Sequence, residues 1–206
     1  MNRLPDDYFD QMYSQSGDPW DLGERWYEQR KYAITLALLP RRQYRHAFEP
    51  GCSVGVLTEH LTQRCARVTA TDVAAAALES ARQRLDTSGR LDQVTLLQRS
   101  VDEPWPSGPF DLLVLSEVGY YLAPEALRGV LDRECARLSS GATVIAAHWR
   151  HRVDDYLMTG DQVNEVVAET AGLHAIGGYR DADVAIDVFD TADGASVATR
   201  TGVPIP

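Results

Sequence analysis

The chain has 206 residues, of which 44% are hydrophobic and 24% charged, and this suits one domain with a core of its own over residues 1–206. Its formal net charge of -10 argues against a nucleic-acid-binding surface, and no apolar run approaches the roughly 20 residues that span a bilayer. Three cysteines without metal-ligand spacing, and a start without the apolar core of a signal peptide, indicate a cytoplasmic protein with reduced thiols and no bound metal.

The first 45 residues are predicted to form two helices, at residues 6–15 and 24–39. Between them, Gly17, Asp18 and Pro19 indicate a turn. We expect this segment, residues 1–45, to act as a helical lid that covers a ligand on the remaining core, residues 46–206.

From residue 47 onward, short apolar or β-branched runs alternate with helical segments. Strands are predicted at residues 47–49, 67–72, 94–98, 111–116 and 142–147, and helices at 56–63, 74–85, 124–138 and 161–171. This alternation is typical of an α/β fold with a mainly parallel sheet. The last two apolar runs, residues 173–176 and 184–189, are separated by too few residues for a crossover helix, so they predict an antiparallel hairpin at the sheet edge.

The loop between the first strand and its helix carries the main motif, from Glu49 to Gly55. In such sheets ligands bind at the carboxyl ends of the strands, and Gly51 and Gly55 permit a close approach to the backbone. The spacing differs from the Gly-x-Gly-x-x-Gly of pyrophosphate sites, which favours S-adenosylmethionine (SAM) over NAD. Glu49 would suit the cationic methionine end of SAM, with Ser53 beside it. An ordinary strand-to-helix turn is the alternative interpretation.

Asp72 ends the second strand, 21 residues after Gly51. An acid at about this distance is placed to accept hydrogen bonds from two ribose hydroxyls. Capping of the following helix is the alternative, and both roles are compatible. Other positions expected to contact the cofactor follow the second, third and fourth strands: Val73, Ser100, Val101 and Ser116.

Three residues on the same rim are candidates for catalysis. Glu117 and Tyr120 follow the fourth strand, where the reacting methyl and the acceptor would meet. His148 ends the fifth strand and is a candidate acceptor contact or proton acceptor. Helix capping, surface packing and a structural histidine are the alternatives. We expect that no single residue is absolutely required as a base.

Four motifs resemble the nodulation protein S family: Glu-Pro-Gly-Cys-Ser-x-Gly-x-Leu-Thr at 49–58, Asp-Pro-Trp at 18–20, Trp-Tyr-Glu-x-Arg-Lys-Tyr at 26–32 and His-Trp-Arg at 148–150. The resemblance covers most of residues 8–150. It implies a class I methyltransferase fold and SAM-dependent N-methylation of a deacetylated chitooligosaccharide. It also implies that Arg30 pairs with the SAM carboxylate and that Trp20 and Trp26 wall the cleft. Without this resemblance, the simpler interpretation is that Trp20 and Trp26 lie in the core and that Arg30 is a solvated helix residue.

Several functions stay open. The leading hypothesis is N-methylation of an amino sugar or an oligosaccharide acceptor. The alternatives are an O-methyltransferase of a small hydroxylated metabolite, a non-catalytic SAM-binding protein, and an NAD-dependent oxidoreductase that the glycine spacing disfavours. The sequence lacks the Asn/Asp-Pro-Pro-Tyr motif of amino-base methyltransferases after the fourth strand, which further disfavours a nucleic-acid substrate. It does not indicate an oligomeric state.

Overall fold

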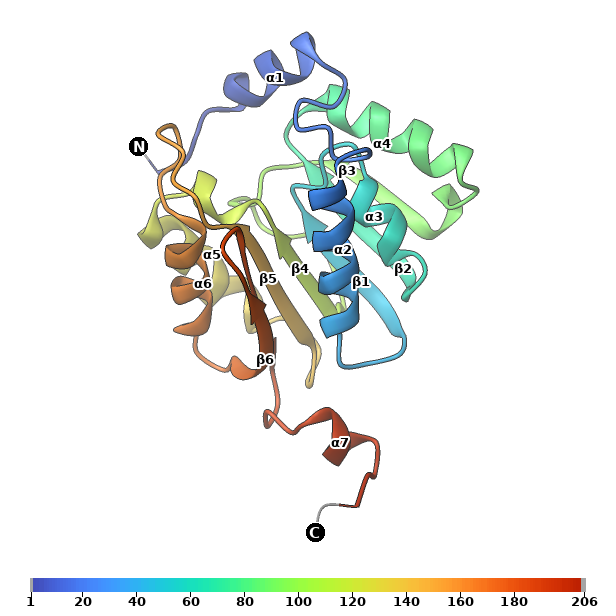
Figure 1. Ribbon diagram of the computed structural model, residues 1–206, viewed down its shortest axis with the longest axis vertical. Coiled ribbons are helices and arrows are strands. Elements are labelled where there is room, and N and C mark those ends of the chain that lie inside the picture. Colours follow the sequence, from blue (N-terminus) through green and yellow to red (C-terminus); the bar gives the residue numbers. More distant parts are fainter. Residues whose placement is uncertain (1, 205–206) are drawn as a thin grey trace.

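A seven-stranded sheet in the order β3-β2-β1-β4-β5-β7-β6 forms the centre of the computed structural model (Figure 1). The structure describes residues 2–204, so Met1, Ile205 and Pro206 of the expected domain lie outside the described residues. Five strands run parallel, and β7 pairs antiparallel with both β5 and β6, which confirms the predicted sheet. The strands are β1 (Tyr44–Pro50), β2 (Cys65–Asp72), β3 (Val94–Gln98), β4 (Leu112–Ser116), β5 (Thr143–Trp149), β6 (His174–Arg180) and β7 (Val184–Asp190).

Helices cover both faces of the sheet. They are α1 (Asp6–Gln15), α2 (Trp26–Leu38), α3 (Val56–Leu61), α4 (Ala75–Thr87), α5 (Pro124–Cys135), α6 (Gly160–Ala168) and α7 (Val197–Arg200), with 3-10 turns η1 (Leu91–Gln93) and η2 (Gly119–Tyr121). Side chains alternate along β4: Leu112 and Val114 join the core beneath α2, α3 and α4, whereas Leu113 and Leu115 join the core beneath α5 and α6. Burial on both faces explains why this strand is apolar throughout.

Two strands, β1 and β6, extend well beyond their sequence signals. β1 begins at Tyr44, inside the segment assigned to the lid, because it pairs with β2 from the register Tyr44↔Cys65 onward. β6 continues through Gly177 and Gly178, which the sequence assigns to a loop. The backbone of β7 supplies ladder partners there, and this pairing overrides the low strand preference of glycine.

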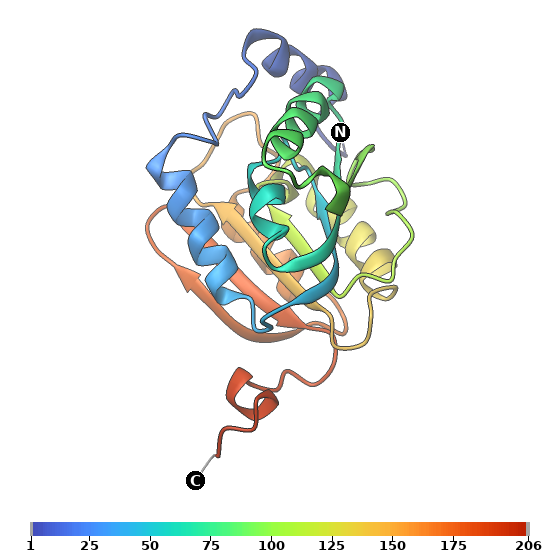
Figure 2. The same ribbon diagram turned by 90° about the vertical axis from the view of Figure 1, so that its right-hand side faces the viewer.

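The carboxyl ends of the parallel strands meet at one edge of the sheet, and α1 lies over this edge, whereas α7 lies at the opposite end (Figure 1). Seen from the side, α1 lies next to α4 (Figure 2). Among residues 2–204, no helix is long and apolar enough to cross a membrane. The topology therefore gathers the loops after β1 to β5 beneath the N-terminal segment.

Candidate active site

A cavity of about 400 Å³ lies between the carboxyl ends of the strands and the N-terminal segment. Its volume falls within the usual range for a small-molecule site. It is lined by residues predicted from the sequence, namely Trp20, Glu49, Gly51, Ser53, Asp72, Val73, Ser100, Val101, Ser116, Glu117 and Tyr120. Four predicted residues, Trp26, Arg30, Gly55 and His148, are not among those that line it.

The loop after β1 turns sharply at the floor of the cavity. Gly51, Ser53 and Gly55 all have left-handed backbones, with φ of 74°, 50° and 76°. A Cβ on Gly51 would lie 2.8 Å from Cγ2 of Val118, so the close approach of two loops requires glycine there. Gly55 instead precedes α3 and packs against Ala81 of α4, where a Cβ would meet the Ala81 Cβ at 2.9 Å.

Asp72 accepts two backbone hydrogen bonds at the end of β2. Its Oδ2 accepts from the N–H of Ser53 at 2.9 Å, and its Oδ1 accepts from the N–H of Ala74 at 3.0 Å. Burial raises the pKa of Asp72, although these backbone donors oppose the shift. A carboxylate offers about four acceptor positions, so it retains acceptor capacity toward the cavity that it lines.

Glu49 lies at the end of β1 and is 3% exposed. Its Oε2 accepts a 2.6 Å hydrogen bond from the hydroxyl of Thr58. Burial raises the pKa of Glu49 to about 8, and the Thr58 hydrogen bond only partly opposes this. The side chain is therefore an acid poised to ionise when a cationic group approaches it.

Glu117 is the centre of a polar network after β4. Its Oε1 accepts a 2.6 Å hydrogen bond from Lys31 Nζ, and its Oε2 accepts from the hydroxyl of Tyr120 at 2.7 Å and the N–H of Trp149 at 2.9 Å. Burial alone would raise the pKa of Glu117, but the Lys31 ammonium and these donors outweigh it and hold the pKa below its usual range. Its φ of 56° is left-handed, a conformation that typically costs about 1–3 kcal/mol in a non-glycine residue.

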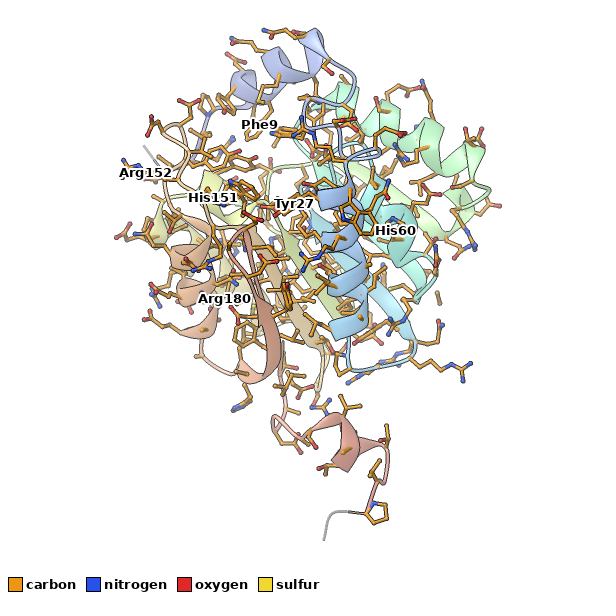
Figure 3. The ribbon with its side chains drawn as sticks, viewed as in Figure 1. Phe9, Tyr27, His60, His151, Arg152 and Arg180 are labelled. Atoms are coloured by element: carbon orange, nitrogen blue, oxygen red, sulfur yellow. The ribbon has the colours of Figure 1, made fainter. Side chains whose placement is uncertain are left out.

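Aromatic rings from three elements form the wall beside Glu117. Tyr120 of η2 stacks on Tyr156 with ring centroids 4.4 Å apart. Tyr27 of α2 meets Trp149 edge-on at 5.1 Å, and Trp149 lies 4.5 Å from the ring of His151. Figure 3 shows Tyr27 and His151 on the same side of the molecule. The wall thus combines electron-rich ring faces with an ionised carboxylate.

His148 does not face the cavity. It is fully buried, its Nδ1 hydrogen bonds Oδ1 of Asn164 at 2.8 Å, and its Nε2 accepts from the N–H of Gly119 at 3.2 Å. Burial lowers the pKa of His148 and outweighs the nearby Glu117 charge. With both ring nitrogens engaged, the imidazole has no free position for an acceptor proton, and the structural role is the better interpretation.

Arg30 also points away from the predicted position. Its guanidinium donates to Oδ2 of Asp181 at 2.9 Å and to the hydroxyl of Tyr179 at 2.5 Å, which ties α2 to the C-terminal hairpin. Trp26 is 73% exposed and does not line the cavity. The cation that α2 directs to the cavity is Lys31, one position further along the helix.

Sequence reasoning missed most lining residues of the N-terminal segment, among them Tyr13, Tyr27, Glu28 and Lys31. Lys31 carried a usable signal, since it is the only lysine in a chain with 20 lysine and arginine residues. Tyr13 and Glu28 carried none, because tyrosine is intermediate in burial and glutamate is mostly exposed, so neither type indicates a cavity position.

Comparison with known proteins identifies the family of the chain. The sequence model of nodulation protein S matches residues 10–169. Nodulation protein S of Bradyrhizobium diazoefficiens is 29% identical over 195 residues, which cover 90% of this chain and 91% of that protein. The protein from Sinorhizobium fredii is 35% identical over 106 residues, about half of each chain.

Two solved methyltransferase structures share the fold of this chain. The N-methyltransferase NodS from Bradyrhizobium japonicum WM9, in complex with S-adenosylhomocysteine, superposes with a TM-score of 0.77 at 24% identity and covers 88% of this chain and 97% of that one. A putative methyltransferase from Pseudomonas syringae superposes with a TM-score of 0.66 at 34% identity, over 81% of this chain and 99% of that one. The fold is that of class I methyltransferases, and the chain belongs to the nodulation protein S family of methyltransferases.

Proposed function

We propose that this chain transfers the methyl group of SAM to a primary amine of an amino sugar or a deacetylated chitooligosaccharide-like acceptor. As a family member the chain is a SAM-dependent methyltransferase, and the acceptor is the part proposed here. The proposal rests on one observation: the ionised carboxylate of Glu117 lies in an aromatic wall of the cavity.

The residues at the strand ends fit SAM. Asp72 retains acceptor positions for ribose hydroxyls, and Val73, Ser100 and Val101 follow the neighbouring strands where an adenine would lie. The buried Glu49 suits the cationic methionine end, because a carboxyl group with a raised pKa ionises when a positive charge lies beside it. When bound, SAM supplies an electrophilic methyl group on sulfur.

Glu117 and the rings would bind and orient the acceptor. An amino sugar at neutral pH carries ammonium, which is attracted by a carboxylate and by tyrosine and tryptophan faces. The amine attacks only after losing that proton. Because the pKa of Glu117 is held low, its carboxylate is a weak base, so we assign it to binding and assign the proton to water. The new N–C bond forms as the S–C bond breaks, and the secondary ammonium product then loses its extra proton.

Matched acceptors test the proposal. Glucosamine oligomers, their N-acetylated counterparts and glucose oligomers differ only in the group at carbon 2, and methyl transfer from isotopically labelled SAM is followed by mass spectrometry. We expect transfer to the free amines alone. Transfer to hydroxyl-only acceptors at a similar rate would instead support O-methylation, and tight SAM binding without transfer would support a non-catalytic protein.

The Glu117→Gln variant tests the role of the carboxylate. It retains the side-chain shape but removes the charge, so the KM for the amine should rise about 10- to 100-fold, the range of one hydrogen bond to a charged group. The Kd for SAM should stay within about threefold, and a thermal melt confirms that the variant folds. An unchanged KM would reject Glu117 as the amine-binding group.

A further inference from the structure

Lys31 is an unusual residue in its place. It is the only lysine of the chain, since every other member of the 20 lysine and arginine residues is an arginine, and it is 2% exposed. Lysine is among the residues least often buried unless its charge is paired. The only lysine side chain of the protein therefore lies in the cavity wall, where the larger planar guanidinium of an arginine would need more room.

The ammonium of Lys31 is held from several sides. Its Nζ lies 2.8 Å from Oε2 of Glu28, one turn earlier on α2, and 2.6 Å from Oε1 of Glu117. The rings of Tyr27 and Tyr32 lie 5.3 Å and 5.5 Å from it. The two attractive carboxylates outweigh burial and raise the pKa of Lys31, so the side chain is a permanent cation.

Contacts hold both the backbone and the side chain of Glu117 in place. Its own N–H donates to the carbonyl of Ala147 at 2.9 Å, so the backbone is fixed at the end of β5 while the side chain reaches α2 and η2. The titratable groups around its carboxylate from the surrounding elements are Tyr27, Glu28, Lys31 and Tyr32 of α2, Tyr120 and Tyr121 of η2, His148 of β5 and Tyr156 of the following loop. Lys31 is the only permanent cation among them, and its charge is the largest of the effects that offset burial of the carboxylate.

We propose that Lys31 is a positioning residue for methyl transfer, which holds Glu117 as a carboxylate in its left-handed conformation so that it faces the acceptor amine. This inference rests on the proposed function, because Glu117 is taken as the amine-binding group. Glu28, Lys31 and Glu117 together carry one net negative charge, which matches a single ammonium on the acceptor. A protonated Glu117 would lose that attraction.

A titration of Glu117 tests the proposal without any acceptor. Glutamate labelled with 13C at the carboxyl carbon gives an NMR signal for Glu117 that is assigned by its loss in Glu117→Gln. In Lys31→Met the pKa of Glu117 should rise by about one to three pH units, the usual effect of a close opposite charge, and Lys31→Arg should restore part of the shift. Arg30→Met removes the neighbouring cation of the same helix and should leave this titration unchanged.

Kinetics give the second readout. In Lys31→Met the acid limb of kcat/KM for the amine should move to higher pH by the same amount as the Glu117 titration, mainly through KM, with the Kd for SAM unchanged. An unshifted Glu117 signal would overturn the proposal. So would a loss of SAM affinity with an unshifted signal, which would assign Lys31 to the cofactor carboxylate. Absence of amine methylation by the unaltered enzyme would reject the proposed function alone, because the titration does not depend on it.

Discussion

The hydroxyl groups of Tyr13 and Ser53 share a hydrogen bond that ties the first helix of the chain to the loop after β1. Trp20 packs edge-on against Tyr13 with ring centroids 5.7 Å apart. One turn earlier on the helix, Phe9 extends toward the strand ends and packs against Tyr121 with ring centroids 4.8 Å apart (Figure 3). We infer that α1 closes the cavity through these contacts and that the Tyr13–Ser53 hydrogen bond holds it closed.

Replacement of Tyr13 by phenylalanine removes the hydrogen bond to Ser53 and retains the aromatic ring. Because one hydrogen bond contributes about 0.5–1.5 kcal/mol, the dissociation rate of bound SAM should rise about 2- to 10-fold, as measured by displacement with S-adenosylhomocysteine. Tyr8→Phe is the control on the same helix, since Tyr8 donates a 3.4 Å hydrogen bond to Asp155 outside the cavity. Equal effects of the two variants would mean that α1 does not close over the cofactor through Tyr13.

The raised pKa of Glu49 predicts that binding of SAM releases a proton from its carboxyl group. Its pKa of about 8 means that it is mostly protonated at pH 7, and a cationic group placed beside it would drive the proton off. SAM affinity should therefore rise as the pH increases from about 6 to about 8 and then level, with proton release seen by calorimetry in two buffers of different ionisation enthalpy. Glu49→Gln should bind more weakly and show neither effect. A pH slope equal to that of the unaltered protein would place the ammonium elsewhere.

The sheet and the glycine-containing loop after β1 were predictable because their signals are local. The apolar run from Leu112 to Leu115 requires burial on both faces, and the topology then brings Gly51 and Asp72 to one edge. The orientation of α2 was not predictable in this way. Its buried residues are mostly polar (Glu28, Lys31, Tyr32 and Thr35), so hydrophobic periodicity does not reveal which face is inside. One position on a helix is a rotation of about 100°, which separates Arg30 from Lys31.

Gly55 illustrates a different limit of the sequence. A glycine motif does not tell whether the missing side chain makes room for a ligand or for another helix, and at Gly55 the neighbour is Ala81. Gly55→Ala should destabilise the protein by about 2–4 kcal/mol, because it combines a left-handed backbone with a packing clash. Gly89→Ala is the matched control, with φ of 67° and no atom near the added Cβ, and should lose only about 1 kcal/mol. Urea denaturation measures both, and equal losses would rule out the contact with Ala81 as a cause.

His148 should make the fold sensitive to acid. The period of two along β5 places it on the same face as Val144 and Ala146, which α6 covers, and there it is neutral, with a pKa that burial holds below the usual value of about 6.5. Below that pH the unfolded chain binds a proton that the native state does not, so the free energy of unfolding should fall as the pH drops.

Between pH 6.5 and 5.5 the loss from His148 should be about 1 kcal/mol, and His148→Gln should show a flatter slope over that interval in urea denaturation. The same variant separates the structural role from a catalytic one. If the imidazole only holds Gly119 and Asn164, the kcat measured at pH 8 under conditions where the variant is folded should fall less than about tenfold. A loss of about 100-fold or more, in the range of general-base catalysis, would return His148 to the reacting centre.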